Sequence, residues 1–258
     1  MIRLLMFGSS HSACFEKLSI SGKLKLNIFA AMGDHILQFL RVNENGEFYL
    51  DDSASDWDKE IFFKSGAGAP QLLSCYDYIV LNTKFDLDLP MLMHGDLSQE
   101  EIDSQILSAS NSLCNSVLQN SFINSPTIIN SIKLVNLLNK AGFDRSKIFV
   151  LVTPFSCEIK ATSKSNHSTY SSSPILQQRI NHILNLSSKF AKDKYDISLI
   201  LPGIEMLGSG FFLDSSYSKN AVNYRSLLLK KASPPQDRIH KNSFYARDML
   251  LRICSKLR

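Results

Sequence analysis

Short apolar runs alternate along the chain with longer segments in which apolar residues recur at every third or fourth position. Continuous runs rich in Ile, Val and Phe predict buried strands, and the helical period predicts helices. Strands that alternate with helices build βαβ units, which stack into a parallel sheet. The pattern therefore predicts an α/β fold, a three-layer α/β/α sandwich with a roughly five-stranded parallel sheet. The strand-like runs are Ile2–Phe7, Leu24–Ala30, Tyr78–Leu81, Ile148–Val152 and Ile197–Leu201.

Four further segments have the helical period. Apolar residues at helical spacing follow Pro126 and Pro174, and each proline stands where a first helical turn tolerates a missing N–H group. The stretch Leu97–Leu118 and the last segment, about Ser243–Cys254, also predict helices.

Two segments do not fit this alternation. Residues at about 38–50 predict a small hairpin insertion, because Asn45 and Gly46 supply the positive φ angles of a tight turn. Residues at about 160–173 are Ser-rich and too poor in apolar side chains to form core, so they predict a mobile surface loop.

The composition is that of an ordinary soluble globular protein, with 44% hydrophobic and 20% charged residues in 258. One three-layer domain of this length buries a sizeable core, so we predict a single domain over residues 1–258. The formal charge of +4 is small and its basic residues are scattered. Nucleic-acid binding is not expected, because it needs a stripe of Lys and Arg that neutralises many phosphates.

Neither the cysteines nor the histidines have the spacing of a metal site. The five cysteines are an odd number without a C-x-x-C pair, which predicts reduced thiols rather than disulfides or a zinc cluster. No nucleotide-binding glycine motif occurs, so no cofactor is expected. The first apolar run is too short for the core of a signal peptide, and no run approaches the length of a membrane span. These features predict a cytoplasmic protein without a membrane span.

The turn after the first strand is a candidate for chemistry. It reads Gly8, Ser9, Ser10 and His11, and a helix is expected to begin there. A serine at this point lies at the carboxyl edge of a parallel sheet, where open α/β folds bind ligands. Helix N-terminal N–H groups nearby can stabilise an oxyanion. The alternative is that Ser9 or Ser10 only caps the helix.

A second candidate lies before the final helix, where Asp237 stands three residues ahead of His240. On one turn the carboxylate can reach the imidazole, fix its tautomer and stabilise the imidazolium that forms when a serine is deprotonated. The alternative is that Asp237 caps a turn and His240 is a surface residue.

Taken together, the two ends of the chain resemble the SGNH (GDSL-like) hydrolases. The family has Gly-x-Ser after its first strand and D-x-x-H shortly before its C-terminal helix. The F-G-S-S-H start and the D-R-I-H-K-N-S-F-Y-A end are similar to a bacterial subgroup that reads G-N-S-H and D-x-x-H-x-N-x-x-Y-G. Weaker similarity extends through Phe63–Gly68 and Tyr76–Leu81. The resemblance implies a flavodoxin-like SGNH hydrolase fold.

The resemblance also implies roles for the candidate residues. Ser10 is the nucleophile, because the family's serine is the second residue after the glycine. His240 takes its proton and Asp237 orients His240. His11 either lines the substrate site or caps the helix.

The oxyanion hole departs from the family pattern. There the N–H of the nucleophile is joined by a glycine N–H and by the asparagine side chain of a G-x-N-D block. Here the strand end reads L-N-T-K-F, so Asn82 is the best partner for the Ser10 N–H, unless it is only a turn former. Gly66 and Gly68 are fallbacks that also suit a flexible connection.

The sequence therefore predicts a serine esterase or O-acyltransferase. The expected substrate is an ester-linked acyl group, acetyl in the first instance, on a small molecule or a carbohydrate. The incomplete oxyanion pattern keeps open a catalytically weak or inactive SGNH-fold binding protein of polysaccharide-related metabolism. A third reading is a flavodoxin-like binder of nucleotide or phosphate at the Gly8–Ser10 turn. Hydrolysis or transfer, and the oligomeric state, are not decided by the sequence.

Overall fold

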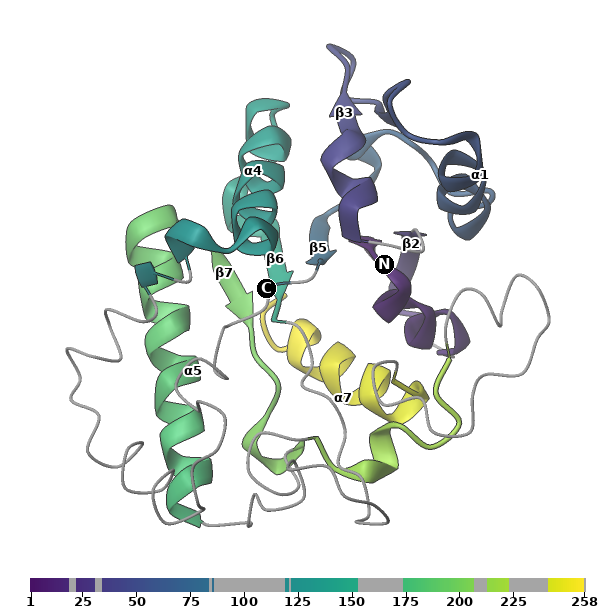
Figure 1. Cartoon of the computed structure of the whole chain (residues 1–258). Helices are drawn as coiled ribbons and strands as arrows, with labels where there is room; N and C mark the ends of the chain where they lie inside the picture. The colour runs from purple at the N-terminus through teal and green to yellow at the C-terminus, as the bar shows by residue number, and fades with distance from the viewer. Residues whose placement is uncertain are drawn as a thin grey trace.

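The structure, a computed structural model, describes residues 1–18, 22–30, 34–83, 85, 119–120, 122–152, 174–206, 213–222 and 241–257. Five strands form a parallel sheet in the order β2-β1-β5-β6-β7 (Figure 1). Their bounds are β1 Ile2–Gly8, β2 Leu24–Ala30, β5 Tyr78–Asn82, β6 Ile148–Leu151 and β7 Ser198–Ile200. The predicted α/β class and all five strands are confirmed.

The strand order is that of flavodoxin-like folds, in which the direction of strand addition reverses beside the first strand. The chain passes from β1 outward to β2, then returns to place β5 on the other side of β1. Ligands of open α/β sheets bind at such a switch point, outside the carboxyl ends of the strands. In this chain that point is the end of β1 beside the end of β5, where Gly8 is paired with Asn82.

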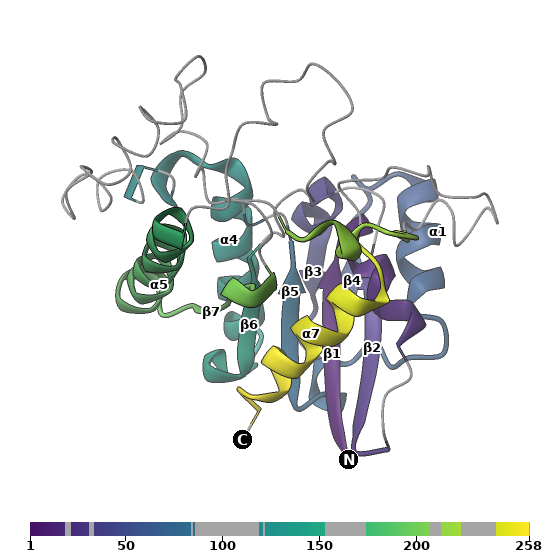
Figure 2. The same cartoon turned by 90° about the horizontal axis from the view of Figure 1, so that it is seen from below.

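Helices cover both faces of the sheet. The α-helices are α1 Asp56–Ser65, α4 Pro126–Lys140, α5 Pro174–Tyr195 and α7 Ser243–Cys254. The 3₁₀-helices are η1 Ser10–Lys17, η2 Asp34–Phe39, η3 Leu73–Cys75, η5 Arg145–Lys147, η7 Ile204–Met206 and η8 Ser215–Tyr217. In Figure 2, α7 crosses in front of the sheet and α4 lies behind it. The helices predicted after the two prolines and at the chain end are confirmed.

Two neighbouring residues at the end of β5 contact helices on opposite faces of the sheet. Asn82 donates to Ser12 of η1, whereas the hydroxyl of Thr83 lies 2.5 Å from that of Ser131 in α4. Successive side chains of an extended chain point to opposite faces, so η1 and α4 lie on opposite sides of the sheet. Since α7 packs against η1, these two helices form one layer. The three-layer arrangement follows.

The predicted hairpin is present as antiparallel β3 (Leu40–Val42) and β4 (Phe48–Leu50). Its turn differs from the expectation, because only Gly46 has a positive φ, of +79°, and Asn45 does not. The N–H of Asn43 bonds to the carbonyl of Glu47, which leaves a three-residue loop that needs one left-handed glycine. Phe48 of β4 packs with its ring centroid 4.9 Å from that of Phe7, so the hairpin is part of the core.

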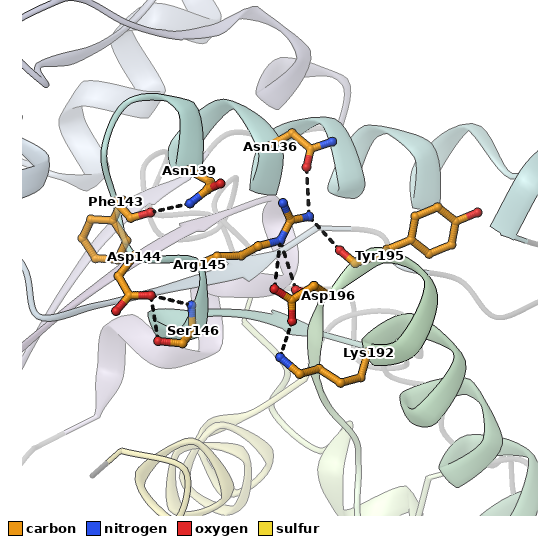
Figure 3. A network of polar contacts seen from close by, with 9 residues as sticks. All are labelled: Asn136, Asn139, Phe143, Asp144, Arg145, Ser146, Lys192, Tyr195 and Asp196. Atoms are coloured by element: carbon orange, nitrogen blue, oxygen red, sulfur yellow. Dashed lines mark hydrogen bonds and ion pairs between the residues drawn. The ribbon is translucent and has the colours of Figure 1, made fainter.

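Arg145, in the 3₁₀-helix before β6, joins α4 to the end of α5 (Figure 3). Its guanidinium donates to Asn136 Oδ1 of α4 at 2.9 Å and to the Tyr195 carbonyl at the end of α5 at 2.7 Å. It also pairs with Asp196, which Lys192 contacts as well. Because η5, which Arg145 begins, directly precedes β6, this network fixes the ends of the two helices relative to the sheet.

Several predictions fall on residues that the structure does not describe. The Leu97–Leu118 helix and the Ser-rich loop at 160–173 lie outside the described residues. A single domain over 1–258 stays a prediction. Within the described ranges, every helix is too short or too polar to span a lipid bilayer.

Candidate active site

The Gly8–Ser10 turn lies at the switch point of the sheet. Gly8 is the last residue of β1 and is paired with Ala30 on one side and Asn82 on the other. The N–H of Ser9 extends the pairing with a 3.3 Å hydrogen bond to the Asn82 carbonyl. Ser10 then begins η1. The sequence expectation that this serine stands between a strand end and a helix start is met.

Close packing explains why the position before the two serines is glycine. A Cβ atom on Gly8 would lie 1.7 Å from Ser12 Oγ and 2.9 Å from Ser12 Cβ. These distances are well inside van der Waals contact, because η1 folds back directly onto the end of β1. The glycine is needed for the approach of the helix and not for a positive φ, since Gly8 is part of the strand.

The hydroxyls of Ser9 and Ser10 differ in their surroundings. Ser9 holds the N-cap position of η1, but its side chain makes no capping hydrogen bond. Its Oγ is buried and has no hydrogen-bond partner among the described residues. Ser10 is half-buried, and its hydroxyl bonds to no described residue. Of the two, only Ser10 is open to a molecule that approaches the sheet edge.

The N–H of Ser10 is an orphan donor of the helix start. The first N–H groups of a helix have no partner within the helix, and that of Ser10 bonds to no other described backbone group. Such a group can donate to an oxyanion that forms on a carbonyl held at the serine. The half-buried His11 follows, with its carbonyl accepting from Cys14 Sγ at 3.2 Å.

Asn82 connects β5 to η1. Its Nδ2 donates a 2.9 Å hydrogen bond to Ser12 Oγ, and both residues are buried. This contact holds the first turn of η1 against the sheet, so Asn82 has a structural partner two residues beyond Ser10. An oxyanion role for Asn82 stays a prediction. The sequence did not predict this hydrogen bond of Ser12, whose only distinguishing feature is its position four residues after Gly8.

Gly66 and Gly68 belong to the connection that follows α1. A Cβ on Gly66 would lie 2.2 Å from the ring of Phe29, and the Gly66 carbonyl accepts from the Ala69 N–H at 2.9 Å. Gly68 is exposed with a φ of +76°. These features are those of a tight turn packed on β2, whereas the alternative that the sequence left open was a flexible connection.

Asp237 and His240 lie outside the described residues, and the chain is described again from Lys241. Lys241 is 1% exposed. Burial raises the pKa of the Cys14 thiol in η1 to about 12, and the nearby Lys241 charge opposes that rise. The residue directly after His240 is therefore buried close to η1, the helix that Ser10 begins.

No metal-site candidate emerges from the described ranges, since none of their His, Cys, Asp and Glu side chains form a group of three or more that could hold an ion.

The comparisons with known proteins give two structural neighbours. No family model matches the chain, and no curated protein matches it. The chain is similar in structure to an extracellular lipase from Streptomyces rimosus, with 10% identity and a TM-score of 0.46 over 100% of both chains. It is also similar to phospholipase A1 from Streptomyces albidoflavus, with 11% identity and a TM-score of 0.40 over 99% of both chains.

Proposed function

We propose that the chain is a serine esterase or O-acyltransferase, with Ser10 as nucleophile, His240 as general base and acid, and Asp237 as the residue that orients His240. The substrate class is an ester-linked acyl group, acetyl in the first instance, on a small molecule or carbohydrate. Water as acceptor makes the reaction a hydrolysis, and a sugar hydroxyl makes it a transfer.

One observation carries the proposal: the chain immediately after His240 is buried beside the helix that Ser10 begins. Lys241 lies near Cys14 of η1, and α7, which starts at Ser243, packs against the same helix. His240 directly precedes Lys241 in the sequence, and the short link between consecutive Cα atoms, about 3.8 Å, supports a role for His240 beside Ser10. The segment that begins at Lys241 is more than 200 residues from Ser10 in the sequence and lies beside the helix that Ser10 begins.

The position of Ser10 supports the nucleophile role. It stands at the switch point of the sheet, half-buried, with an unused N–H at the start of η1. The hydroxyl of a serine is a weak nucleophile until a base takes its proton, and an imidazole ordinarily titrates close to neutral pH.

The proposed reaction has two steps. Ser10 Oγ attacks the acyl carbonyl as His240 takes its proton, and the carbonyl oxygen becomes an oxyanion that the Ser10 N–H stabilises. The carbon–oxygen bond to the alcohol then breaks, and the alcohol leaves with the proton from His240. In the second step His240 takes a proton from water or an acceptor hydroxyl as that oxygen attacks the acyl-enzyme. The bond from the acyl carbon to Ser10 Oγ then breaks, and His240 returns the proton to Ser10 Oγ.

The bonding of Asn82 favours a second candidate, a catalytically weak or inactive binding protein. Its side-chain amide, the group expected as the second oxyanion donor, already donates a hydrogen bond to Ser12. Loss of one oxyanion donor lowers the rate by about 100- to 1000-fold. A chain with only the Ser10 N–H would bind an ester or carbohydrate and turn it over slowly.

A serine-directed fluorophosphonate separates the two candidates. The esterase is labelled once per chain at Ser10, and the Ser10→Ala variant is not labelled. Folded protein that takes up no label favours the binding protein. A burst of nitrophenol from p-nitrophenyl acetate, followed by added carbohydrate as acceptor, then distinguishes hydrolysis from transfer.

A cytoplasmic location remains part of the proposal. Cys14, Cys75 and Cys254 are free thiols in the described ranges, as a reducing compartment would keep them.

A further inference from the structure

Asn45 and Gly46 lie at the tip of the hairpin between β3 and β4, and the proposed function does not use them. They are the only Asn-Gly pair in the chain. Asn45 is exposed, and its side chain bonds to no described residue. A Cβ on Gly46 would meet nothing within 4 Å, so the space around this glycine is open. The pair is therefore accessible to water and is not crowded by neighbouring side chains.

An asparagine followed by glycine can lose its side-chain amide without an enzyme. The backbone nitrogen of the glycine attacks the asparagine Cγ, and glycine favours this approach because it has no Cβ. A carbon–nitrogen bond forms, and the amide nitrogen leaves as ammonia with the proton of the glycine nitrogen. Water then opens the succinimide ring. Opening at Cγ gives aspartate, and opening at the main-chain carbonyl gives isoaspartate, whose backbone runs through Cβ and Cγ.

The hairpin loop restrains the nitrogen that would attack. The N–H of Gly46 donates to the Asn43 carbonyl at 3.0 Å. The Oδ1 of Asn43 accepts from the N–H groups of Asn45 and Glu47, each also at 3.0 Å. The attacking nitrogen must give up its proton, and in the closed loop this proton is held in a hydrogen bond. The loop therefore has to open before the reaction, and the Asn43 side chain opposes the opening.

We propose that Asn45 is a site of spontaneous deamidation, with water as co-reactant, and that the Asn43 side chain sets its rate. In the folded chain the reaction proceeds through the small fraction of loops that are open at any time. Loss of the two hydrogen bonds to Asn43 Oδ1 raises this fraction by about tenfold. The proposal is independent of the chemistry at Ser10.

The isoaspartate product does not fit the closed hairpin. Its backbone is one carbon longer, whereas the hydrogen bond between Asn43 and Glu47 closes a loop of three residues. Phe48 follows this loop, is fully buried and packs on Phe7 with ring centroids 4.9 Å apart. Either the pairing of β3 with β4 shifts or the loop loses its hydrogen bonds, so the modified chain is less stable.

The test uses the full chain with Asn43→Ala and Asn43→Asp. Alanine removes the Oδ1 acceptor, whereas aspartate keeps it and loses only the bond to Glu47 Oε2. Each protein is incubated in neutral buffer, and peptide mass spectrometry follows deamidation at Asn45. Asn124, exposed and followed by a serine, is the comparison within the same chain. Circular dichroism checks that every variant is folded.

We expect wild-type protein to deamidate at Asn45 before Asn124. Asn43→Ala should deamidate at Asn45 about tenfold faster than wild type, and Asn43→Asp should stay within about threefold. Earlier deamidation at Asn124 overturns the site, and equal rates in folded wild type and folded Asn43→Ala overturn the control by Asn43. If Asn43→Ala does not fold, wild-type chain in urea replaces it, because its loop is open. A rate in urea no higher than in native protein then overturns the proposal.

The effect of the extra backbone carbon is measured on the isoaspartate form, identified with an isoaspartyl methyltransferase and separated by ion exchange. Asn45→Asp is the matched control, since it carries the same charge on a backbone of normal length. The isoaspartate form should unfold at a lower urea concentration than Asn45→Asp. Equal midpoints would overturn the argument that the closed loop excludes isoaspartate.

Discussion

The amide of Asn82 reaches across the end of the sheet to the hydroxyl of Ser12, with 2.9 Å between nitrogen and oxygen. Both side chains are buried, at 3% and 0% exposure, so the bond is shielded from water. It joins β5 to the helix that begins at Ser10, across the switch point of the sheet. The Gly8–Ser10 turn is thereby attached to the neighbouring strand β5.

This bond predicts a measurable coupling between the two residues. Asn82→Ala leaves a buried hydroxyl without its donor and should lower the free energy of unfolding by about 1–3 kcal/mol. In a double-mutant cycle with Ser12→Ala, urea unfolding should give an interaction energy of at least about 0.5 kcal/mol. Asn124→Ala, on an exposed side chain, is the control and should stay within about 0.5 kcal/mol of wild type. Additive single effects at Asn82 and Ser12 would contradict the bond.

Gly8→Ala should destabilise the protein, because its new methyl group would overlap Ser12 Oγ at 1.7 Å. Overpacking of this kind costs about 1–3 kcal/mol, and Ser12→Ala in the same chain should recover part of the loss. Gly22 is the matched control, since a Cβ there meets nothing within 4 Å. Gly22→Ala should leave the unfolding midpoint in urea unchanged or raise it slightly. Equal midpoints for the two alanine variants would show that η1 is not close to β1.

Ser9→Ala should not destabilise the protein. The buried hydroxyl of Ser9 has no hydrogen-bond partner in the described part of the chain, and such a group costs about 1–3 kcal/mol. Removing it should raise the free energy of unfolding, while fluorophosphonate labelling at Ser10 continues. A loss of stability above about 1 kcal/mol would mean that this hydroxyl has a bonding partner.

Tyr217 should make stability depend on alkaline pH. Burial, together with the hydrogen bond to Asp248 at 2.7 Å and the charge of that carboxylate, raises its pKa well above the ordinary 10.0. The unfolded chain therefore loses this proton first, so the contribution of Tyr217 is complete below about pH 10 and declines above it. The difference in unfolding free energy between wild type and Tyr217→Phe should shrink from about pH 9 to about pH 11. A difference that stays constant over that range would contradict the partly buried hydrogen bond between Tyr217 and Asp248.

The free cysteines should react with iodoacetamide in a definite order. Cys14 is fully buried with a pKa of about 12, so almost no thiolate forms at neutral pH. Cys254 is exposed at the end of α7 and, although partial burial raises its pKa, reagent reaches it. Peptide mass spectrometry should find Cys254 alkylated in native protein and Cys14 only after denaturation. Early alkylation of Cys14 would mean that η1 detaches from the sheet.

The pattern of apolar residues was sufficient to predict the sheet and three of the helices. Strands such as Ile148–Leu151 are buried on both faces, so nearly every side chain is apolar and the run stands out. The hairpin was also predicted, but the geometry of its turn was not. Whether the loop has two or three residues depends on which strand residues pair. Phe48, which packs on Phe7, sets that register.

The candidate site was predictable only in part. Gly8 and Ser10 could be predicted because they directly follow the apolar run of the first strand, which is a local feature of the sequence. The hydrogen bond from Asn82 to Ser12 joins residues far apart in the sequence, as does the proximity of the Lys241 charge to Cys14. Single side chains of this kind leave no periodic pattern in the sequence. Asn242 belonged to the C-terminal motif, yet its bonds to Ser216 and Lys219 require the folded segment 213–222.

The N–H of Val222 donates a hydrogen bond to the carbonyl of Lys241 at 3.0 Å, so the two ends of residues 223–240 are held together. Because these ends are already together, lengthening or replacing the stretch costs little extra closure entropy and leaves the sheet untouched. Substitutions within residues 223–240 can therefore accumulate without changing the two residues that hold the ends of this stretch together. Exchange of this stretch for one of another length, with Val222 and Lys241 retained, is therefore a practical way to engineer the chain.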